Sequence, residues 1–256
     1  MKVFINGGTG FIGSHLINKL NSKNYNIISL RRKSSRPRIK LDKDPKWISD
    51  KDTIKLKKAM NGCRFFINCA ASGVSPQKAS WEELINYNIH KTFSLFILAA
   101  KSGIRDFLFL GSEMEASIGK LFSIEENENL NPYSASKATA FILFCSYAKL
   151  NNLNLKYIKI PNVYGEGQFS ENLWPSLKKA ANSGENFIIK NKNTTRNFIS
   201  VKKVSNIISE NLILNDKNIN TVDVINVKGK KMRVGEFAQL HWKKWQANGK
   251  LIFQEK

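Results

Sequence analysis

The chain has 256 residues, 42% of them hydrophobic and 11% aromatic, and its 41 basic and 20 acidic residues give a net charge of +21. This composition excludes a disordered or fibrous protein, and no apolar run reaches the roughly 20 residues of a membrane-spanning helix. The basic residues are dispersed, so we expect a solvated basic surface and an anionic small ligand, with no nucleic-acid or membrane partner. We predict a cytoplasmic protein.

The clearest signal lies at the start of the chain, where an apolar run at 2–6 is followed at once by the turn GGTGFIG at 7–13. Apolar residues then recur at helical spacing as far as Leu20, and a second apolar run occupies 26–30. A glycine turn between a strand and a helix lets the backbone approach a pyrophosphate, and the helix N-terminus supplies free N–H groups to it. The pattern predicts a dinucleotide site formed by Gly7, Gly10, Phe11, Ile12 and Gly13.

The rest of the chain alternates between apolar runs and helical patterns. Strands are expected at 65–69, 107–110, 157–160 and 222–227, and helices at 53–60, 81–102, 133–151 and 201–214. This alternation predicts an α/β fold with a Rossmann-type doubly wound parallel sheet. Residues 1–164 are expected to form an NAD(P)-binding Rossmann domain, with 194–227 packing back onto it, and 165–193 with 228–256 to form a small substrate-binding lobe.

The end of the second expected strand indicates which dinucleotide is bound. Enzymes that use NAD place a carboxylate there for the ribose 2′-OH, whereas those that use NADP place an arginine near the 2′-phosphate. Here Leu30 is followed by Arg31 and Arg32, and no carboxylate occurs before Asp42. Guanidinium groups suit bidentate phosphate contacts, so we predict NADP, with NAD possible; a solvated loop that follows the general basic bias is the alternative.

Three further residues suggest proton chemistry. Tyr133 and Lys137 are four residues apart on an expected helix and so lie on one face, and Ser112 follows the expected strand at 107–110. An ammonium near a phenol favours the phenolate and lowers its pKa, and a serine at the carboxyl edge of the sheet can orient a reacting carbonyl. The YxxxK spacing alone also fits an ordinary helix face. The three cysteines have no metal-ligand spacing, and no metal is expected.

Together these motifs resemble those of the extended short-chain dehydrogenases/reductases, specifically the NAD(P)-dependent sugar-nucleotide epimerase/dehydratase family. The resemblance covers roughly residues 1–230. It is carried by the turn at 7–13, Cys69-Ala70-Ala71, Asn88, GSEME at 111–115, YSASK at 133–137, PNVYG at 161–165 and RNFISV at 196–201. The chain departs from the family in Ala116-Ser117, where a Tyr-Gly pair is usual, and in its shorter length, which points to a small substrate lobe.

The resemblance implies a role for each matching residue. Tyr133 would be the general acid/base, Lys137 would hold the nicotinamide ribose, and Ser112 would orient the substrate, with Glu113 beside it. The implied cofactor contacts are Asp50 at the adenine, together with Ala70, Ala71 and Asn88. Asn162 and Arg196 would bind the diphosphate of a nucleotide-sugar substrate, although a turn cap and a surface ion pair are the plainer interpretations of these two.

The same scaffold supports several reactions. A 4,6-dehydratase needs an acid–base pair after the serine, and Met114 cannot act as a base. A 4-epimerase retains NAD, which Arg31 disfavours. A reductase of a nucleotide-linked 4-keto-(di)deoxy sugar needs only NADPH and the Tyr133 proton, so it is the predicted function, with the epimerase as the alternative and a non-catalytic dinucleotide sensor as a further one. The resemblance also implies a homodimer and a role in polysaccharide biosynthesis.

Overall fold

The computed structural model describes residues 1–256 except 50–51, 74–79, 116–130, 213–220 and 255–256. The chain forms two compact units. The first unit consists of Met1–Ile160 and Ser205–Val227, and the second consists of Pro161–Val204 and Lys228–Lys256.

A seven-stranded sheet forms the centre of the first unit. Its strand order is β10-β6-β5-β4-β1-β2-β3, and every neighbouring pair is parallel. The order reverses at β1, which lies between β4 and β2, and ligands of such sheets bind beyond the carboxyl ends of the strands at this point. The strands are β1 (Lys2–Asn6), β2 (Asn26–Leu30), β3 (Lys46–Ile48), β4 (Phe65–Asn68), β5 (Asp106–Ser112), β6 (Asn154–Ile160) and β10 (Val222–Asn226).

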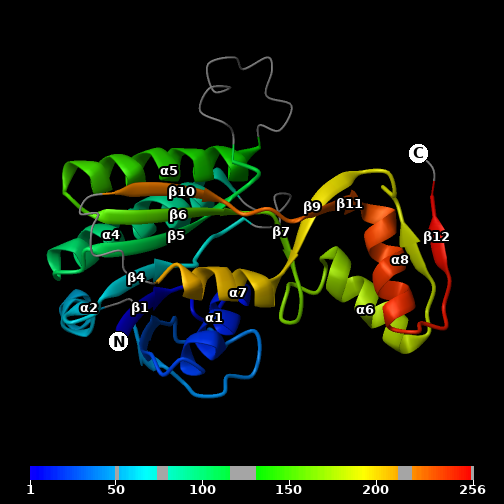
Figure 1. The fold of residues 1–256 in the computed structure, drawn as a ribbon, viewed down its shortest axis with the longest axis horizontal. Helices are drawn as coiled ribbons and strands as arrows, with labels where there is room; N and C mark the ends of the chain where they lie inside the picture. The colour runs from blue at the N-terminus through cyan, green and yellow to red at the C-terminus, as the bar shows by residue number, and fades with distance from the viewer. Residues whose placement is uncertain (50–51, 74–79, 116–130, 213–220, 255–256) are drawn as a thin grey trace, which may run out of the picture. The chain divides into compact units, whose positions relative to one another are not determined.

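Helices cover both faces of this sheet, as Figure 1 shows, so the predicted doubly wound α/β fold is confirmed. Helices α2, α4 and α5 lie on one face, and α1 lies on the other with the part of α7 that belongs to the first unit. No helix in the described ranges is long and apolar enough to cross a membrane. The helices are α1 (Phe11–Asn21), α2 (Thr53–Met60), α3 (Trp81–Leu84), α4 (Thr92–Lys101), α5 (Pro132–Leu150) and α7 (Val201–Glu210).

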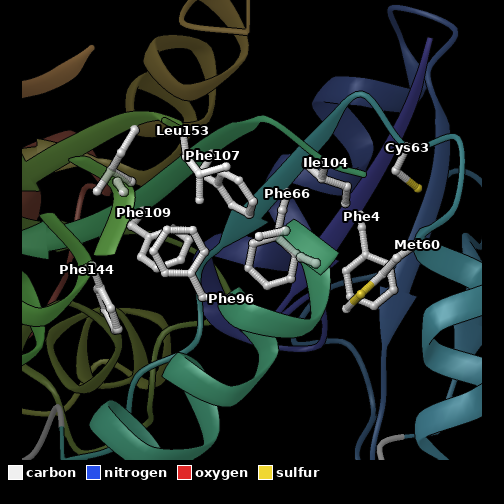
Figure 2. Close-up of a cluster of buried hydrophobic side chains, with 14 of the residues drawn as sticks. Phe4, Met60, Cys63, Phe66, Phe96, Ile104, Phe107, Phe109, Phe144 and Leu153 are labelled. Atoms are coloured by element: carbon white, nitrogen blue, oxygen red, sulfur yellow. The ribbon is translucent and has the colours of Figure 1, made fainter. Parts of the chain in front are cut away.

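The core under α4 and α5 is rich in phenylalanine. Figure 2 shows the rings of Phe66, Phe96, Phe107, Phe109 and Phe144 gathered in one cluster. The Phe96 ring lies 4.5 Å from that of Phe107 and 4.9 Å from that of Phe109, both edge to face, which is the favoured arrangement of aromatic pairs. Since every strand of the cluster contributes from one side of the pleat, this packing fixes β4 and β5 beneath the two helices that begin near their carboxyl ends.

The expected helix at 81–102 is a single helical run with an irregular middle. It comprises α3, the π-helical stretch η2 (Ile85–Lys91) and α4. A π-helical turn accommodates one residue more than an α-helical turn and is common near functional sites. In this stretch Asn88 is the buried residue.

The second unit contains two small sheets and two helices. A three-stranded sheet has the order β11-β9-β7 and a two-stranded sheet pairs β12 with β8. Their core is formed by apolar residues of α6 and α8, among them Leu177, Phe237 and Trp242, against Phe198 of β9. The elements are β7 (Asn162–Tyr164), α6 (Leu173–Ser183), β8 (Phe187–Ile189), β9 (Thr195–Ser200), β11 (Lys230–Arg233), α8 (Val234–Lys244) and β12 (Leu251–Phe253).

The boundaries of these units differ from the predicted ones. We predicted that 194–227 packs onto the first domain, whereas β9 forms a sheet with β7 and β11 within the second unit. Only Ser205–Val227 returns to the first unit, where β10 pairs with β6. The assignment of cofactor binding to one part and substrate binding to the other stays a prediction.

Candidate active site

The glycine turn follows β1 directly and is closed by a hydrogen bond from Gly10 N to Gly7 O, 2.9 Å long. Gly7 has φ +85°, a conformation that L side chains rarely adopt, and a Cβ there would come within 2.6 Å of Ala70 N. A Cβ on Gly13 would collide with the carbonyl of Gly7. Both positions therefore need glycine, because the turn packs against the start of α1 and against the segment after β4.

This turn leaves the start of α1 open to a ligand. Gly10 is the N-cap and has no side chain to cap the helix, and the first turn contains no acidic residue. The first N–H groups of an α-helix have no intrahelical acceptors and carry a partial positive charge. Residues Phe11, Ile12 and Gly13 supply these groups, so the cradle fits the pyrophosphate of a dinucleotide.

Arg31 and Arg32 follow the last residue of β2. The Arg31 guanidinium lies 5.0 Å from the centre of the Trp47 ring, and that of Arg32 lies 6.0 Å from the Tyr87 ring, both in the range of cation–π contacts. The backbone N–H of Arg31 donates to Ile48 O, which ties the end of β2 to β3. Aromatic rings thus support both side chains at the place where a ribose 2′-phosphate is expected.

The segment after β4 contributes through its backbone. Ala70 lies against Gly7, and Cys69 N donates to Asn6 O, so this segment continues along the carboxyl end of β1. The amide of Asn88 crosslinks two elements: Ser72 N donates to its Oδ1 at 2.8 Å, and its Nδ2 donates to Ser72 O and to Ser136 Oγ. Asn88 therefore fixes the segment that contains Ala70 and Ala71 to helix α5, whatever direct cofactor contact it makes.

Helix α5 presents Tyr133 and Lys137. Its start is fixed by a capping box in which Asn131 accepts from Ser134 N and Ser134 Oγ accepts from Asn131 N, with Pro132 in the first turn. Lys137 is buried, and its Nζ donates to Leu110 O of β5 at 2.7 Å. This bond fixes the ammonium beside the strand that contains Ser112.

Ser112 is the last residue of β5 and begins a tight turn. Met114 N donates to Ser112 Oγ at 3.1 Å, and Ser112 is also hydrogen-bonded to the phenol of Tyr133. Because its oxygen accepts from the backbone, the hydroxyl hydrogen of Ser112 can point toward Tyr133 or a substrate oxygen. The structure thus brings together Ser112, Tyr133 and Lys137, as the sequence predicted.

One expectation about this group is wrong in this structure. We predicted that the ammonium of Lys137 lowers the pKa of Tyr133. Burial of the phenol, followed by the negative charge of Glu115, instead raises the pKa of Tyr133 to about 12, and the hydrogen bond from Ser112 only partly opposes this. Burial lowers the pKa of Lys137 itself, against the opposite effect of Glu115. Tyr133 is therefore a phenol at neutral pH, ready to donate a proton.

Glu115 is the site residue that sequence reasoning missed. It is 8% exposed, it lies three residues after Ser112, and its carboxylate faces the interior of the first unit. The available signal was a carboxylate in a segment that leads out of a buried strand, but its partners come from β6, more than 40 residues further along the chain.

The remaining predicted residues lie apart from this group or outside the description. Glu113 is exposed, and its backbone N–H donates to Ile160 O. Asn162 on β7 and Arg196 on β9 both belong to the second unit, where Asn162 is opposite Phe198, two positions from Arg196. Asp50 lies outside the described residues. Within the described ranges, no three His, Cys, Asp or Glu residues are grouped as a metal site would require.

Comparison with known proteins identifies the family. The profile of the NAD dependent epimerase/dehydratase family matches residues 3–227. The chain therefore belongs to this family of NAD(P)-dependent enzymes, and the predicted family and enzyme class are confirmed.

Individual relatives are distant. A decarboxylating sterol-4-alpha-carboxylate 3-dehydrogenase of Dictyostelium discoideum is 28% identical over 176 residues, which are 64% of this chain and 53% of the relative. The match thus spans about half of that protein's length. Among solved structures, a UDP-N-acetylglucosamine 4-epimerase from Methanobrevibacter ruminantium is 24% identical with a TM-score of 0.78, covering 100% of this chain and 85% of the other. A UDP-glucose 4-epimerase from Thermotoga maritima has a TM-score of 0.80 at 20% identity, covering 99% and 85%. These likenesses confirm the fold.

Proposed function

We propose that this protein is an NADPH-dependent reductase of a nucleotide-linked 4-keto-deoxy sugar. The observation that carries the proposal is the hydrogen-bonded pair of Ser112 and Tyr133, in which Tyr133 retains its proton. A reductase needs a proton donor at the carbonyl oxygen, whereas a 4-epimerase must first remove a proton from the sugar hydroxyl. Support for NADPH comes from Arg31 and Arg32 at the end of β2.

The residues of the site can be assigned roles in such a reduction. When bound, the reduced nicotinamide supplies the hydride for the carbonyl carbon. The glycine turn and the start of α1 bind the pyrophosphate, and Arg31 and Arg32 bind the 2′-phosphate. Ser112 donates a hydrogen bond to the carbonyl oxygen and orients it. Tyr133 then transfers its proton to that oxygen, which leaves a phenolate that Lys137 stabilises and that water reprotonates.

In the second unit, Asn162 and Arg196 are the candidates for binding the substrate diphosphate. They lie on neighbouring strands of one small sheet, which keeps their spacing constant. Arg196 is exposed and presents a guanidinium suited to phosphate. Glu113 is the candidate for contact with the sugar, because it follows Ser112 directly.

A 4-epimerase with bound NAD is the second candidate, and the comparisons favour it. The two solved structures named above are titled as 4-epimerases. A Methanocaldococcus jannaschii protein provisionally named UDP-glucose 4-epimerase is 24% identical over 91% of this chain and 79% of its own length. A non-catalytic sensor is disfavoured, since a sensor has no need of the Ser112, Tyr133 and Lys137 set.

The test uses the full chain with two substrates. A nucleotide-linked 4-keto-6-deoxyhexose, generated in place by a 4,6-dehydratase, is mixed with NADPH, and UDP-glucose is offered separately with NAD. We expect the keto sugar to oxidise NADPH, and Tyr133→Phe to lower kcat by about 10²–10⁴-fold while it still binds NADPH. Tyr147→Phe, on the same helix but in the aromatic core, is the matched control and should keep its rate. Interconversion of UDP-glucose and UDP-galactose without NADPH oxidation would establish the epimerase instead.

A further inference from the structure

Glu115 is a buried carboxylate for which the proposed reaction gives no role. Its side chain is 1% exposed, and burying a charge is costly unless partners compensate it. The chain also makes room for it, because a Cβ on Gly111 would lie 2.8 Å from Glu115 Oε1 and would collide with the ring of Tyr157. A charge kept at such cost directly after Ser112 calls for an explanation.

The first part of the explanation is mechanical. Glu115 Oε1 accepts hydrogen bonds from Ser112 N and from Tyr157 Oη, each 2.8 Å long. Glu115 N also donates to Ser112 O at 3.2 Å. The carboxylate thus ties the turn that contains Ser112 to strand β6, in addition to the backbone bonds between β5 and β6.

The second part is electrostatic. Glu115 Oε2 lies 3.4 Å from Lys159 Nζ and has no hydrogen-bond partner among the described residues, so an ion pair alone holds it. The titratable groups around it are Tyr133, Lys137 and Cys145 from α5 and Tyr157 and Lys159 from β6. Its charge acts on Tyr133, Tyr157 and Cys145 in one direction: it disfavours loss of their protons. Tyr133 alone among these three is a proposed proton donor.

We propose that Glu115 is a positioning residue of the active site, whose carboxylate anchors the Ser112 turn and keeps Tyr133 in the proton-donating form. This inference rests on the proposed function for its meaning, since a proton-donating Tyr133 serves reduction. The two effects come from different features of the same side chain: hydrogen bonding at Oε1 positions Ser112, and the negative charge acts on Tyr133. They can therefore be separated by substitution.

The first experiment titrates Tyr133 in the cofactor-free full chain, by the ultraviolet absorbance of tyrosinate. Each protein is compared with its own Tyr133→Phe partner, so that the difference isolates Tyr133 from the other tyrosines. Glu115→Gln keeps the shape and an oxygen acceptor but removes the charge. We expect Tyr133 to lose its proton at a pH about one unit lower in this variant, a tenfold change in proton affinity.

Two further variants control for structure and for charge in general. Tyr157→Phe removes a hydrogen bond to Glu115 but leaves its charge, so Tyr133 should titrate as in the unsubstituted chain. Glu185→Gln removes an exposed carboxylate of the second unit and should have no effect. The proposal is overturned if Glu115→Gln leaves the titration of Tyr133 in place, or if Tyr157→Phe lowers it equally, because the effect would then be one of packing.

The second experiment follows the reduction itself across pH. Reduction requires protonated Tyr133, so the rate falls as pH rises through the pKa of that residue. In Glu115→Gln this fall should occur at lower pH, while Tyr157→Phe should lower the rate at all pH values without moving the fall. Because the titration needs no substrate, it can succeed where the reductase assay fails. A failed reductase assay would thus refute the proposed function, and a failed titration would refute the role of Glu115.

Discussion

Arg31 and Arg32 show how a cofactor preference can depend on two side chains. Both follow β2 and pack on aromatic rings, which limits the freedom they lose when a phosphate binds. Guanidinium groups bind phosphate by charge-assisted, often bidentate hydrogen bonds. NADH lacks the 2′-phosphate, so these contacts act on NADPH alone.

From this we expect the double substitution Arg31→Ala, Arg32→Ala to weaken NADPH binding at least about tenfold, or 1.4 kcal/mol. NADH binding should change little, so the preference between the two is lost. Calorimetry at one stated salt concentration measures both, because a chain of net charge +21 binds any phosphate more tightly in dilute buffer. Arg105→Ala is the control, since this exposed arginine precedes β5 at the opposite ends of the strands. An equal loss for NADPH and NADH would contradict the assignment.

At this scale the sequence was most informative where chemistry is local. The turn at 7–13 and the pair Tyr133 and Lys137 are recognisable because a fixed short spacing sets their geometry. Glu115 was not recognisable, because its role depends on Tyr157 and Lys159, which only the pairing of β5 with β6 brings near it. The protonation of Tyr133 was mispredicted for the same reason.

Among the elements, α8 contains the least expected polar residue. His241 is 7% exposed, lies among the rings of Tyr164, Phe237 and Trp245, and has no hydrogen-bond partner for either ring nitrogen among the described residues. Burial, and secondarily the charge of Lys244, lowers the pKa of His241 to about 4. The imidazole is therefore neutral in the folded second unit.

This pKa predicts that acid destabilises the protein. An unfolded histidine binds a proton near pH 6.5, whereas His241 binds one only near pH 4 when folded, so the unfolded state takes up more protons in between. The contribution to stability is complete above pH 6.5 and is lost as pH falls to 4, by about 3 kcal/mol in total. Denaturant unfolding of wild type and His241→Phe at pH 7.5 and pH 5 should show a smaller loss in the variant. Equal losses would mean that His241 is protonated while buried.

The elements of the first unit were largely predictable, because long apolar runs and helical periodicity determine them. The strands at 26–30 and 65–68 and the helix at 53–60 lie where their patterns indicated. Strand β3 was missed because three residues are too few to show alternation. The short strands of the second unit were missed for the same reason, and η2 was read as part of a regular helix because periodicity does not register one added residue.

For the molecule as a whole, the family resemblance implies a homodimer built on paired helices. The exposed large apolar residues include Trp81 of α3, Ile85 of η2 and Ile142 of α5, at 57%, 44% and 42% exposure. Both α3 and η2 pack against α5, so these side chains lie on one group of adjoining helices. Such exposed residues on neighbouring helices are a candidate contact between copies.

We therefore expect Ile142→Glu to convert a dimer into monomers in sedimentation velocity, because the partner helix would then face a buried unpaired charge. Its circular dichroism should match that of the unsubstituted chain, since Ile142 is exposed within one copy. Leu150→Glu places the same charge at the end of the same helix, where the residue is 83% exposed, and should leave the dimer intact. A monomeric unsubstituted chain would rule out the expectation.

The way in which the chain passes between its two units has a consequence for what makes this protein individual. The family profile ends at residue 227, which is also the last residue of the first unit. The tail that follows supplies β11 to pair with β9 and β12 to pair with β8, and it contributes all of α8. A truncation at 227 would therefore leave the family's shared sequence nearly whole, yet strip Phe198 and Ile189 of their cover. Divergence from its relatives is thus confined to a segment without which the second unit has no closed core.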